Sequence, residues 1–237
     1  MIRVKELCLK TFSQMKLTEK QQRVLTLLAQ SPLAKKFYWT GGTLLASYYL
    51  YHRKSIDLDF FSEEPFLFED VNNFVQQISK ELGFRKVNSK KIFNRWEFLF
   101  ENHEPLRIEF VYYNHDKKTL KKRVILHGVF IDSLEDIAAN KTLAYFDRNE
   151  PKDLFDLFFL MTKKDFIVTR LLNLTHEKFG LTFAESLFWS EAFKHFPLLH
   201  TLKPLLENNE ENPETLLRTI ESYFKKESAE FLKRNLK

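Results

Sequence analysis

Two aspartates stand at alternate positions in the segment SIDLDFF, whose other residues are mostly typical of a buried strand. Because side chains alternate across a strand, the pattern predicts an apolar face with Ile56, Leu58 and Phe60, and an opposite face with Asp57, Asp59 and Phe61. Two carboxylates on one face repel each other unless a cation neutralises them, and hard oxygen donors favour Mg²⁺ or Mn²⁺. The segment therefore predicts a metal-binding strand, with a solvent-exposed strand edge as the alternative.

Two of the chain's five glycines, Gly41 and Gly42, are adjacent and precede this strand. The residues before them, KKFYWT, predict a short strand, and TLLASYYLYH after them predicts a helix. A turn from a strand into a helix presents backbone N–H groups and the positive end of a helix dipole, which together bind phosphate. Gly41, Gly42 and Thr43 are therefore candidate phosphate-binding residues, although such turns also use glycine for backbone reasons alone.

A third acid on a neighbouring strand would complete a site for two metal ions. The segment LRIEFVYY predicts a strand in which Glu109 faces away from the apolar side chains. Glu97, in RWEFLF, is the alternative third acid. We favour Glu109 because its flanking residues are typical of a central strand, whereas Glu97 lies close to Arg95, as an edge residue would.

The rest of the first 132 residues predicts two helices and three strands. Thr18 and Gln21 have the spacing of a capping box and begin a helix that runs to about Ala29. A second helix covers about 68 to 82 and ends at Gly83, and three strands follow with turns near 88 to 90 and 102 to 105. The basic segment HDKKTLKKRVIL closes this part, and we interpret its charged run as a solvated loop, with an RNA-contacting segment as the alternative.

From Ser133 onward the sequence has the pattern of helices, the first of which runs to about Asp147. The expected helix starts are the pair Ser133 and Asp136, Pro151, the pair Thr182 and Glu185, and Asn212-Pro213. We therefore expect an α/β (α+β) chain. Its mixed-sheet core would occupy residues 1–132, and an all-helical C-terminal domain over 133–237 would pack on that core.

The composition is that of an ordered globular protein, with 44% hydrophobic and 29% charged residues in 237. No apolar run approaches the ~20 residues of a membrane helix, and the charged N-terminus does not resemble a signal peptide, so we expect a cytoplasmic protein. Lys and Arg number 22 against 15 Asp and Glu in residues 1–132, a balance of +7, and 15 against 17 in residues 133–237, a balance of −2. A basic first part is compatible with a nucleotide or RNA partner but is weak evidence for one.

The order of these features resembles the nucleotidyltransferase superfamily of DNA polymerase beta, and more closely the AbiEii/AbiGii type nucleotidyltransferase toxin family. That family has the pattern G-G-x-x-L-x₇-R-x-S-x-D-h-D-F-F, matched here by Gly41, Gly42, Leu45, His52, Arg53, Ser55, Asp57, Asp59, Phe60 and Phe61. It also has a later pair of helical motifs, matched by Lys141, Ala144, Arg148, Lys152, Asp153, Asp156 and Leu157. The resemblance covers residues 38–61 and about 105–160.

The resemblance implies roles for the acids, for the glycine turn and for the later lysine. Asp57, Asp59 and Glu109 would hold Mg²⁺ or Mn²⁺, and these acids together with Lys141 would be catalytic. The nucleotide-binding residues would be Gly41, Gly42, Thr43, Arg53, Ser55, Lys141 and Asp156. By helical spacing Lys141, Tyr145 and Arg148 share one face, so that Lys141 would contact the triphosphate. Asp153 and Asp156 would orient Lys141 or a basic neighbour. An ordinary surface with ion pairs is the alternative for these charges.

We therefore hypothesise a metal-dependent nucleotidyltransferase that transfers NMP from an NTP to an acceptor hydroxyl and releases pyrophosphate. In the family that the resemblance implies, the acceptor can be tRNA and the outcome can be growth arrest. The partner in that family is a cognate antitoxin. A catalytically silent nucleotide- or RNA-binding module with the same fold is the alternative. A kinase is a weaker one, because the chain lacks GxGxxG and GxxxxGK[ST] loops.

Overall fold

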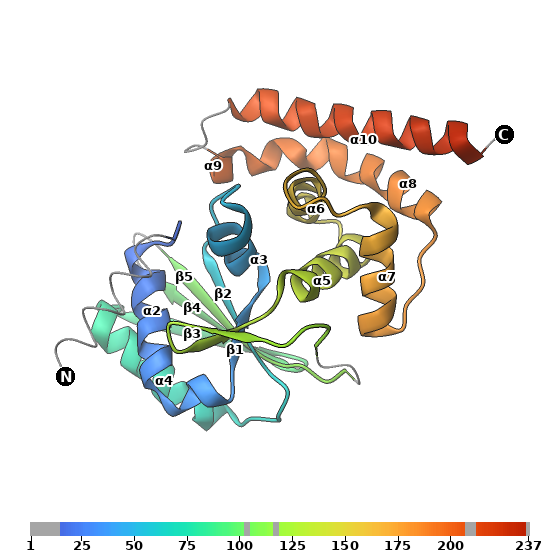
Figure 1. Cartoon of the computed structure of the whole chain (residues 1–237). Helices are drawn as coiled ribbons and strands as arrows, with labels where there is room; N and C mark the ends of the chain where they lie inside the picture. The colour runs from blue at the N-terminus through green and yellow to red at the C-terminus, as the bar shows by residue number, and fades with distance from the viewer. Residues whose placement is uncertain (1–14, 102–104, 116–118, 207–211, 236–237) are drawn as a thin grey trace. The chain divides into compact units, whose positions relative to one another are not determined.

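The structure, a computed structural model, describes residues 15–101, 105–115, 119–206 and 212–235 (Figure 1). The chain divides into two compact units between Ser133 and Leu134. The first unit contains the sheet, and the second contains only helices among its described residues. None of the helices in the described part of the chain combines the length and apolar character that a membrane span requires.

Within the described residues, seven strands form one mixed sheet in the order β3-β4-β5-β2-β1-β7-β6. The pairs β2–β5 and β1–β7 are parallel, and the other neighbouring pairs are antiparallel. The strands are β1 (Tyr38–Thr40), β2 (Asp57–Ser62), β3 (Lys86–Ile92), β4 (Arg95–Glu101), β5 (Leu106–Tyr112), β6 (Val124–Leu126) and β7 (Val129–Ile131). The fold class predicted from the sequence is confirmed.

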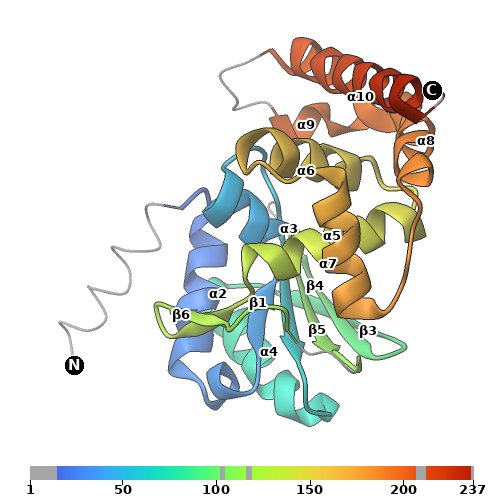
Figure 2. The same ribbon diagram turned by 45° about the vertical axis from the view of Figure 1, so that its right-hand side comes forward.

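Two helices, α2 (Glu19–Gln30) and α4 (Phe68–Leu82), lie side by side on one face of the sheet (Figures 1 and 2). The Thr18 hydroxyl accepts from Gln21 N, and the Gln21 side chain accepts from Thr18 N, so the predicted capping box is confirmed. Gly83 ends α4 with φ 68°. Phe74 of α4 packs edge-on against Phe110 of β5, which closes the apolar core on this face.

The strand β1 turns directly into α3 (Gly41–Leu44), which continues as one π-helical segment, Leu45–Leu50. A short 3₁₀ helix, η1 (Pro32–Lys35), precedes β1. The predicted strand-to-helix turn at the glycine pair is therefore confirmed. The π-helical continuation was not foreseen, because periodicity alone does not separate α from π winding over six residues.

Two local predictions in this unit are wrong. The predicted turn at 88–90 is wrong, because Asn88, Ser89 and Lys90 lie inside β3, and the turn falls at Phe93-Asn94, where Phe93 has φ 50°. These polar residues are tolerated because β3 is an edge strand.

Ile56 precedes β2 and is 52% exposed, so it does not belong to the apolar face. The short β6–β7 hairpin was missed, and the predicted turn at 102–105 lies largely outside the described residues.

The second unit is built from α5 (Leu134–Asp147), α6 (Pro151–Lys163), α7 (Val168–Phe179), α8 (Glu185–His195), η3 (Phe196–Leu202), α9 (Lys203–Leu206) and α10 (Pro213–Asn235). Pro151 and Pro213 begin helices as predicted, and Asn212 Oδ1 caps the last helix by accepting from Glu214 N at 2.8 Å. Thr182 is not a helix cap. The N-cap of α8 is Ala184, and the Thr182 hydroxyl instead lies 3.1 Å from His176 Nδ1.

Candidate active site

The register of three neighbouring strands places four carboxylates together on the face of the sheet opposite Phe110. Asp59 of β2 lies directly opposite Glu109 of β5, and Glu109 lies opposite Glu97 of β4. Asp57 is two residues before Asp59 on the same strand face. We call these four side chains the acidic cluster (Asp57, Asp59, Glu97 and Glu109).

The opposite side of the same strands is apolar, as the alternation predicts. Leu58, Phe60 and Ile108 are fully buried. Glu109 is only 6% exposed, because β5 is a central strand between β4 and β2. The structure therefore brings Asp57, Asp59 and Glu109 to one place, with Glu97 one strand further out.

Two arginines lie among these acids. The guanidinium of Arg107, the residue opposite Asp57 in the register, is ion-paired through Nη2 with Asp57 Oδ2. Its Nη1 lies 3.5 Å from Glu97 Oε2 and 3.7 Å from Glu109 Oε1. Arg95 Nη1 lies 3.3 Å from Glu109 Oε2. Four carboxylates against two guanidiniums leave these six side chains with a summed charge of −2.

The electrostatic environment follows from this arrangement. Burial raises the pKa of Glu109 above its ordinary value, and nearby Arg95 and Arg107 reduce that rise without cancelling it. Burial by itself would lower the pKa of Arg107, but its hydrogen bond to Asp57 and the surrounding carboxylates raise it instead. Arg107 is therefore held in its charged form by the acidic cluster.

The acidic cluster fits a divalent cation by donor type and charge. Its donors are carboxylate oxygens, which Mg²⁺ and Mn²⁺ prefer, and one divalent cation would neutralise the summed charge of −2. The distances between these side chains do not match a metal site. Among the described residues, no group of three or more His, Cys, Asp or Glu side chains is arranged as metal ligands would be. In this structure the Arg107 guanidinium bridges the acids.

The backbone at Gly41 is shaped around the Asp59 carboxylate. Gly41 has φ 80°, and a Cβ at this position would overlap Asp59 Oδ2 and lie 2.7 Å from Asp59 Cγ. Both the conformation and the space therefore require glycine here. The start of α3 and the acidic cluster are in direct contact.

The other residues of the first motif fasten this turn to β2. The Thr43 hydroxyl donates to the Asp57 carbonyl oxygen and lies 2.8 Å from Ser55 Oγ. Thr43 is 1% exposed. Arg53 is buried and donates from Nη1 to the Lys54 carbonyl at 3.1 Å. These side chains hold the loop between the π-helical segment and β2 in place, and their predicted contact with a nucleotide stays a prediction.

Lys141 of α5 forms a buried network in the second unit. Its Nζ lies 2.9 Å from Asp153 Oδ1 and 2.7 Å from Asp156 Oδ2, and both aspartates belong to α6. Arg148 Nε adds a contact of 2.7 Å to Asp153 Oδ2. Burial by itself would raise the pKa of Asp153, but Lys141 and Arg148 outweigh burial and hold the pKa below its ordinary value.

Tyr145, predicted on the same helical face, is fully buried and donates to the Phe188 carbonyl at 2.7 Å. It stacks on His195, whose pKa burial lowers. Tyr145 is therefore a core residue of the helical unit.

The comparisons with known proteins identify the family. The model of the family described as nucleotidyl transferase AbiEii toxin, type IV TA system, matches residues 23–234. The chain belongs to this family. It is a nucleotidyltransferase of the type found in toxin–antitoxin systems.

Two relatives show how far the likeness of this AbiEii-family chain extends. The uncharacterised Aquifex aeolicus (strain VF5) protein aq_aa25 is 28% identical over 219 residues, which cover 92% of this chain and 98% of the relative. The crystal structure of JHP933 from Helicobacter pylori superposes with a TM-score of 0.56 at 20% identity, over 92% of this chain and 95% of JHP933. At that identity the second likeness concerns the fold alone.

Arg107 and Arg95 contact the acids of the cluster, and the sequence did not predict these contacts. The signal was present, because Arg107 stands two residues before Glu109 and must share its strand face. Alternation alone did not reveal that this face is shared with Asp57, since that depends on β5 lying beside β2.

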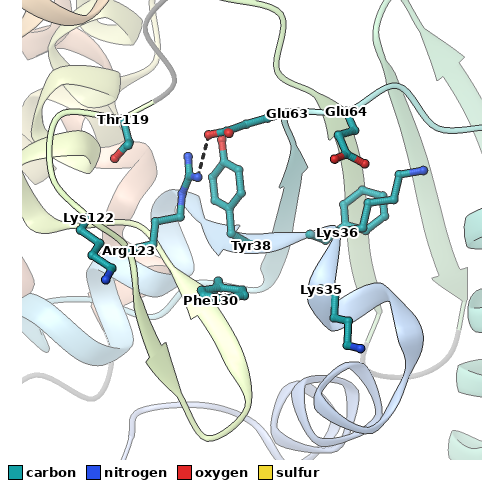
Figure 3. A pocket seen from close by; sticks show the side chains of 10 residues that line it. Lys35, Lys36, Tyr38, Glu63, Glu64, Thr119, Lys122, Arg123 and Phe130 are labelled. Atoms are coloured by element: carbon teal, nitrogen blue, oxygen red, sulfur yellow. Dashed lines mark ion pairs between the residues drawn. The ribbon is translucent and has the colours of Figure 1, made fainter.

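A separate cavity of about 390 Å³ lies at the other end of β1 from Gly41 (Figure 3). Arg123 lies 3.5 Å above the ring centroid of Tyr38 and forms ion pairs with Glu63 at 2.6 Å and Asp132 at 2.8 Å. Two carboxylates therefore balance this guanidinium. We assign Arg123 a structural role, which is to fasten the segment before β6 to the ends of β1 and β2.

Proposed function

We propose that this AbiEii-family nucleotidyltransferase uses a divalent cation, Mg²⁺ or Mn²⁺, to transfer NMP from an NTP to an acceptor hydroxyl, with release of pyrophosphate. The observation that carries the proposal is the acidic cluster beside Gly41, with its summed charge of −2 on one face of a central pair of strands. An NTP brings further negative charge, so its binding there requires cations.

In this proposal the core, residues 1–132, provides the catalytic acids. Asp57, Asp59 and Glu109 would hold the metal, which would neutralise phosphate charge and make the attacking hydroxyl more acidic. The backbone from Gly41 to Thr43 would bind the outer phosphates through N–H groups, and Arg53 and Ser55 would keep this loop in position. Glu109 is preferred to Glu97 as the third acid, because Glu109 is directly opposite Asp59.

The helical unit would contribute Lys141. As the family resemblance implies, its ammonium would contact the triphosphate, and Asp153 and Asp156 would orient it. Two carboxylates within 2.9 Å of Nζ support the orienting role, since they leave the ammonium few other directions. Asp156 would take part in nucleotide binding only through Lys141.

The acceptor in this proposal is tRNA or another RNA, in the cytoplasm, and the product of transfer arrests growth until a cognate antitoxin counteracts it. The balance of +7 over residues 1–132, from 22 basic and 15 acidic residues, is compatible with a polyanionic acceptor. The family supports the toxin–antitoxin setting. The helical C-terminal part would select the acceptor, bind the antitoxin or only complete the core.

One observation favours the second candidate, a catalytically silent nucleotide- or RNA-binding module. Arg107 already neutralises part of the acidic cluster through its ion pair with Asp57. A chain whose acids were permanently paired with arginines would bind nucleotide without turning it over. Metal linkage separates the two candidates, because a cation that binds only the folded state raises the melting temperature.

The test is transfer of label from each α-³²P-NTP to total tRNA with Mg²⁺ or Mn²⁺. We expect label in RNA with the wild type, and a rate at least about 100-fold lower with Asp57→Asn. Glu81→Gln is the matched control, because Glu81 is an exposed acid of the same unit that pairs with Arg23. Tight NTP binding without transfer under any metal would instead support the silent module.

A further inference from the structure

The side chain of Arg107 lies at the centre of the acidic cluster. It pairs with Asp57 through Nη2 and approaches Glu97 and Glu109 through Nη1 at 3.5 and 3.7 Å. One guanidinium therefore touches three carboxylates that come from three strands. Arg95, the other arginine placed beside the cluster, lies 3.3 Å from Glu109 Oε2.

Arg107 has one close ion pair, with Asp57, and two weaker contacts with the other acids. Its side chain is 36% exposed, and the two Nη1 contacts are long for charge-assisted hydrogen bonds. Its Nε is buried without a hydrogen-bond partner. The Arg107 guanidinium is more accessible to solvent than that of Arg123, whose side chain is 15% exposed.

A divalent cation that bound Asp57 would compete with Arg107 for the same oxygen. Both bind carboxylates through charge, and Asp57 Oδ2 is the atom that the guanidinium contacts. With the cation in place, a guanidinium beside it would be repelled. The N–H donors of the displaced Arg107 guanidinium would then be available to an anionic oxygen of the substrate. Guanidinium geometry matches phosphate as well as carboxylate.

We propose that Arg107 is an exchangeable counter-ion that holds Asp57 in the cation-free protein, weakens cation binding there, and moves to a phosphate oxygen of the nucleotide when cation and NTP bind together. The inference rests on the proposed function. Arg107 would thus make cation binding depend on nucleotide, which prevents the acidic cluster from retaining a cation without substrate.

The experiment measures Mn²⁺ binding to the full chain without nucleotide, by paramagnetic resonance of free Mn²⁺ and by calorimetry. For Arg107→Met we expect Mn²⁺ affinity about five-fold or more above that of the wild type, equivalent to about 1 kcal/mol. Arg107→Lys retains the charge and should bind Mn²⁺ within about two-fold of the wild type. Arg23→Met, which removes a partly buried arginine that pairs with Glu81, is the control and should leave Mn²⁺ affinity unchanged.

The second readout is nucleotide affinity measured in the presence of Mn²⁺ with a non-hydrolysable NTP. Arg107→Met should weaken it about ten-fold, so that the two affinities change in opposite directions. A purely structural role for Arg107 would weaken both. Thermal midpoints of each variant, measured without metal, establish that the compared proteins are folded, and Arg107→Gln replaces Arg107→Met if the latter is not.

The inference is overturned if the folded neutral variant binds Mn²⁺ no more tightly than the wild type, including the case in which neither protein binds Mn²⁺. That result would leave the proposed function intact if the wild type still labels RNA. Conversely, tighter Mn²⁺ binding by Arg107→Met without transfer by the wild type would support the role of Arg107 as a counter-ion and contradict the transferase proposal.

Discussion

Gly41 and Asp59 are in such close contact that no side chain fits between them. A Cβ on Gly41 would overlap Asp59 Oδ2, and the backbone there has φ 80°. The glycine is therefore required by the carboxylate as well as by the turn. This contact joins the start of α3 to the acidic cluster.

Gly41→Ala should lower transfer activity by at least about 100-fold, because the new methyl group must push the Asp59 carboxylate out of place. Gly83→Ala is the control. Gly83 also has a positive φ, of 68°, but has nothing within 4 Å of its Cβ position, so it shares the backbone strain of about 1 kcal/mol without the overlap. Initial rates and urea unfolding of both variants make the comparison. Equal activity losses would show that strain alone matters.

The third acid can be assigned by a pair of isosteric substitutions. Glu109→Gln should reduce kcat/KM by about 100-fold or more, because Glu109 lies directly opposite Asp59, whereas Glu97→Gln should reduce it less than about ten-fold. Steady-state kinetics over a range of Mn²⁺ concentrations would measure both. A larger loss with Glu97→Gln would reverse the assignment.

Lys141→Met should destabilise the fold by about 3–5 kcal/mol, because it leaves Asp153 and Asp156 buried without their ammonium. Lys178→Met provides the matched comparison, since Lys178 Nζ is also buried and lies 2.8 Å from Asp136 Oδ1 in the same unit. Urea unfolding should show similar losses for the two. Transfer by the folded fraction should fall only with Lys141→Met, and an equal fall with both would assign Lys141 a structural role.

The stability of the protein should depend on Asp153 at acid pH. Its pKa in the folded state is held below the ordinary 3.8 by Lys141 and Arg148 despite burial. The unfolded chain therefore binds a proton first as the pH falls, so the stabilisation is present above about pH 4 and is lost as the pH drops through the folded pKa. The unfolding free energy of Asp153→Asn should be lower than that of the wild type at pH 7. It should also change less than that of the wild type between pH 5 and 3. Parallel pH profiles for both proteins would contradict this.

Several elements could be predicted because their signals are local. The capping box of α2, the end of α4 at Gly83 and the helix starts at Pro151 and Pro213 each depend on a few adjacent residues. The prediction of a turn at 88–90 was wrong because strand pairing, and not the local residues, determines the structure there. Its polar residues are typical of a turn, but β3 pairs with β4 along its whole length, and an edge strand accepts polar side chains.

The sequence by itself determined which side chains share a face on each strand, because alternation follows from the backbone of one strand alone. It thereby placed Asp57 with Asp59, and set Glu109 apart from its apolar neighbours. Only the tertiary structure decided that β5 lies beside β2 with Asp59 opposite Glu109, that Arg107 pairs with Asp57, and that Gly41 leaves room for Asp59. These relationships depend on strand order and register, which come from pairings between residues far apart in the chain, and no local pattern specifies them.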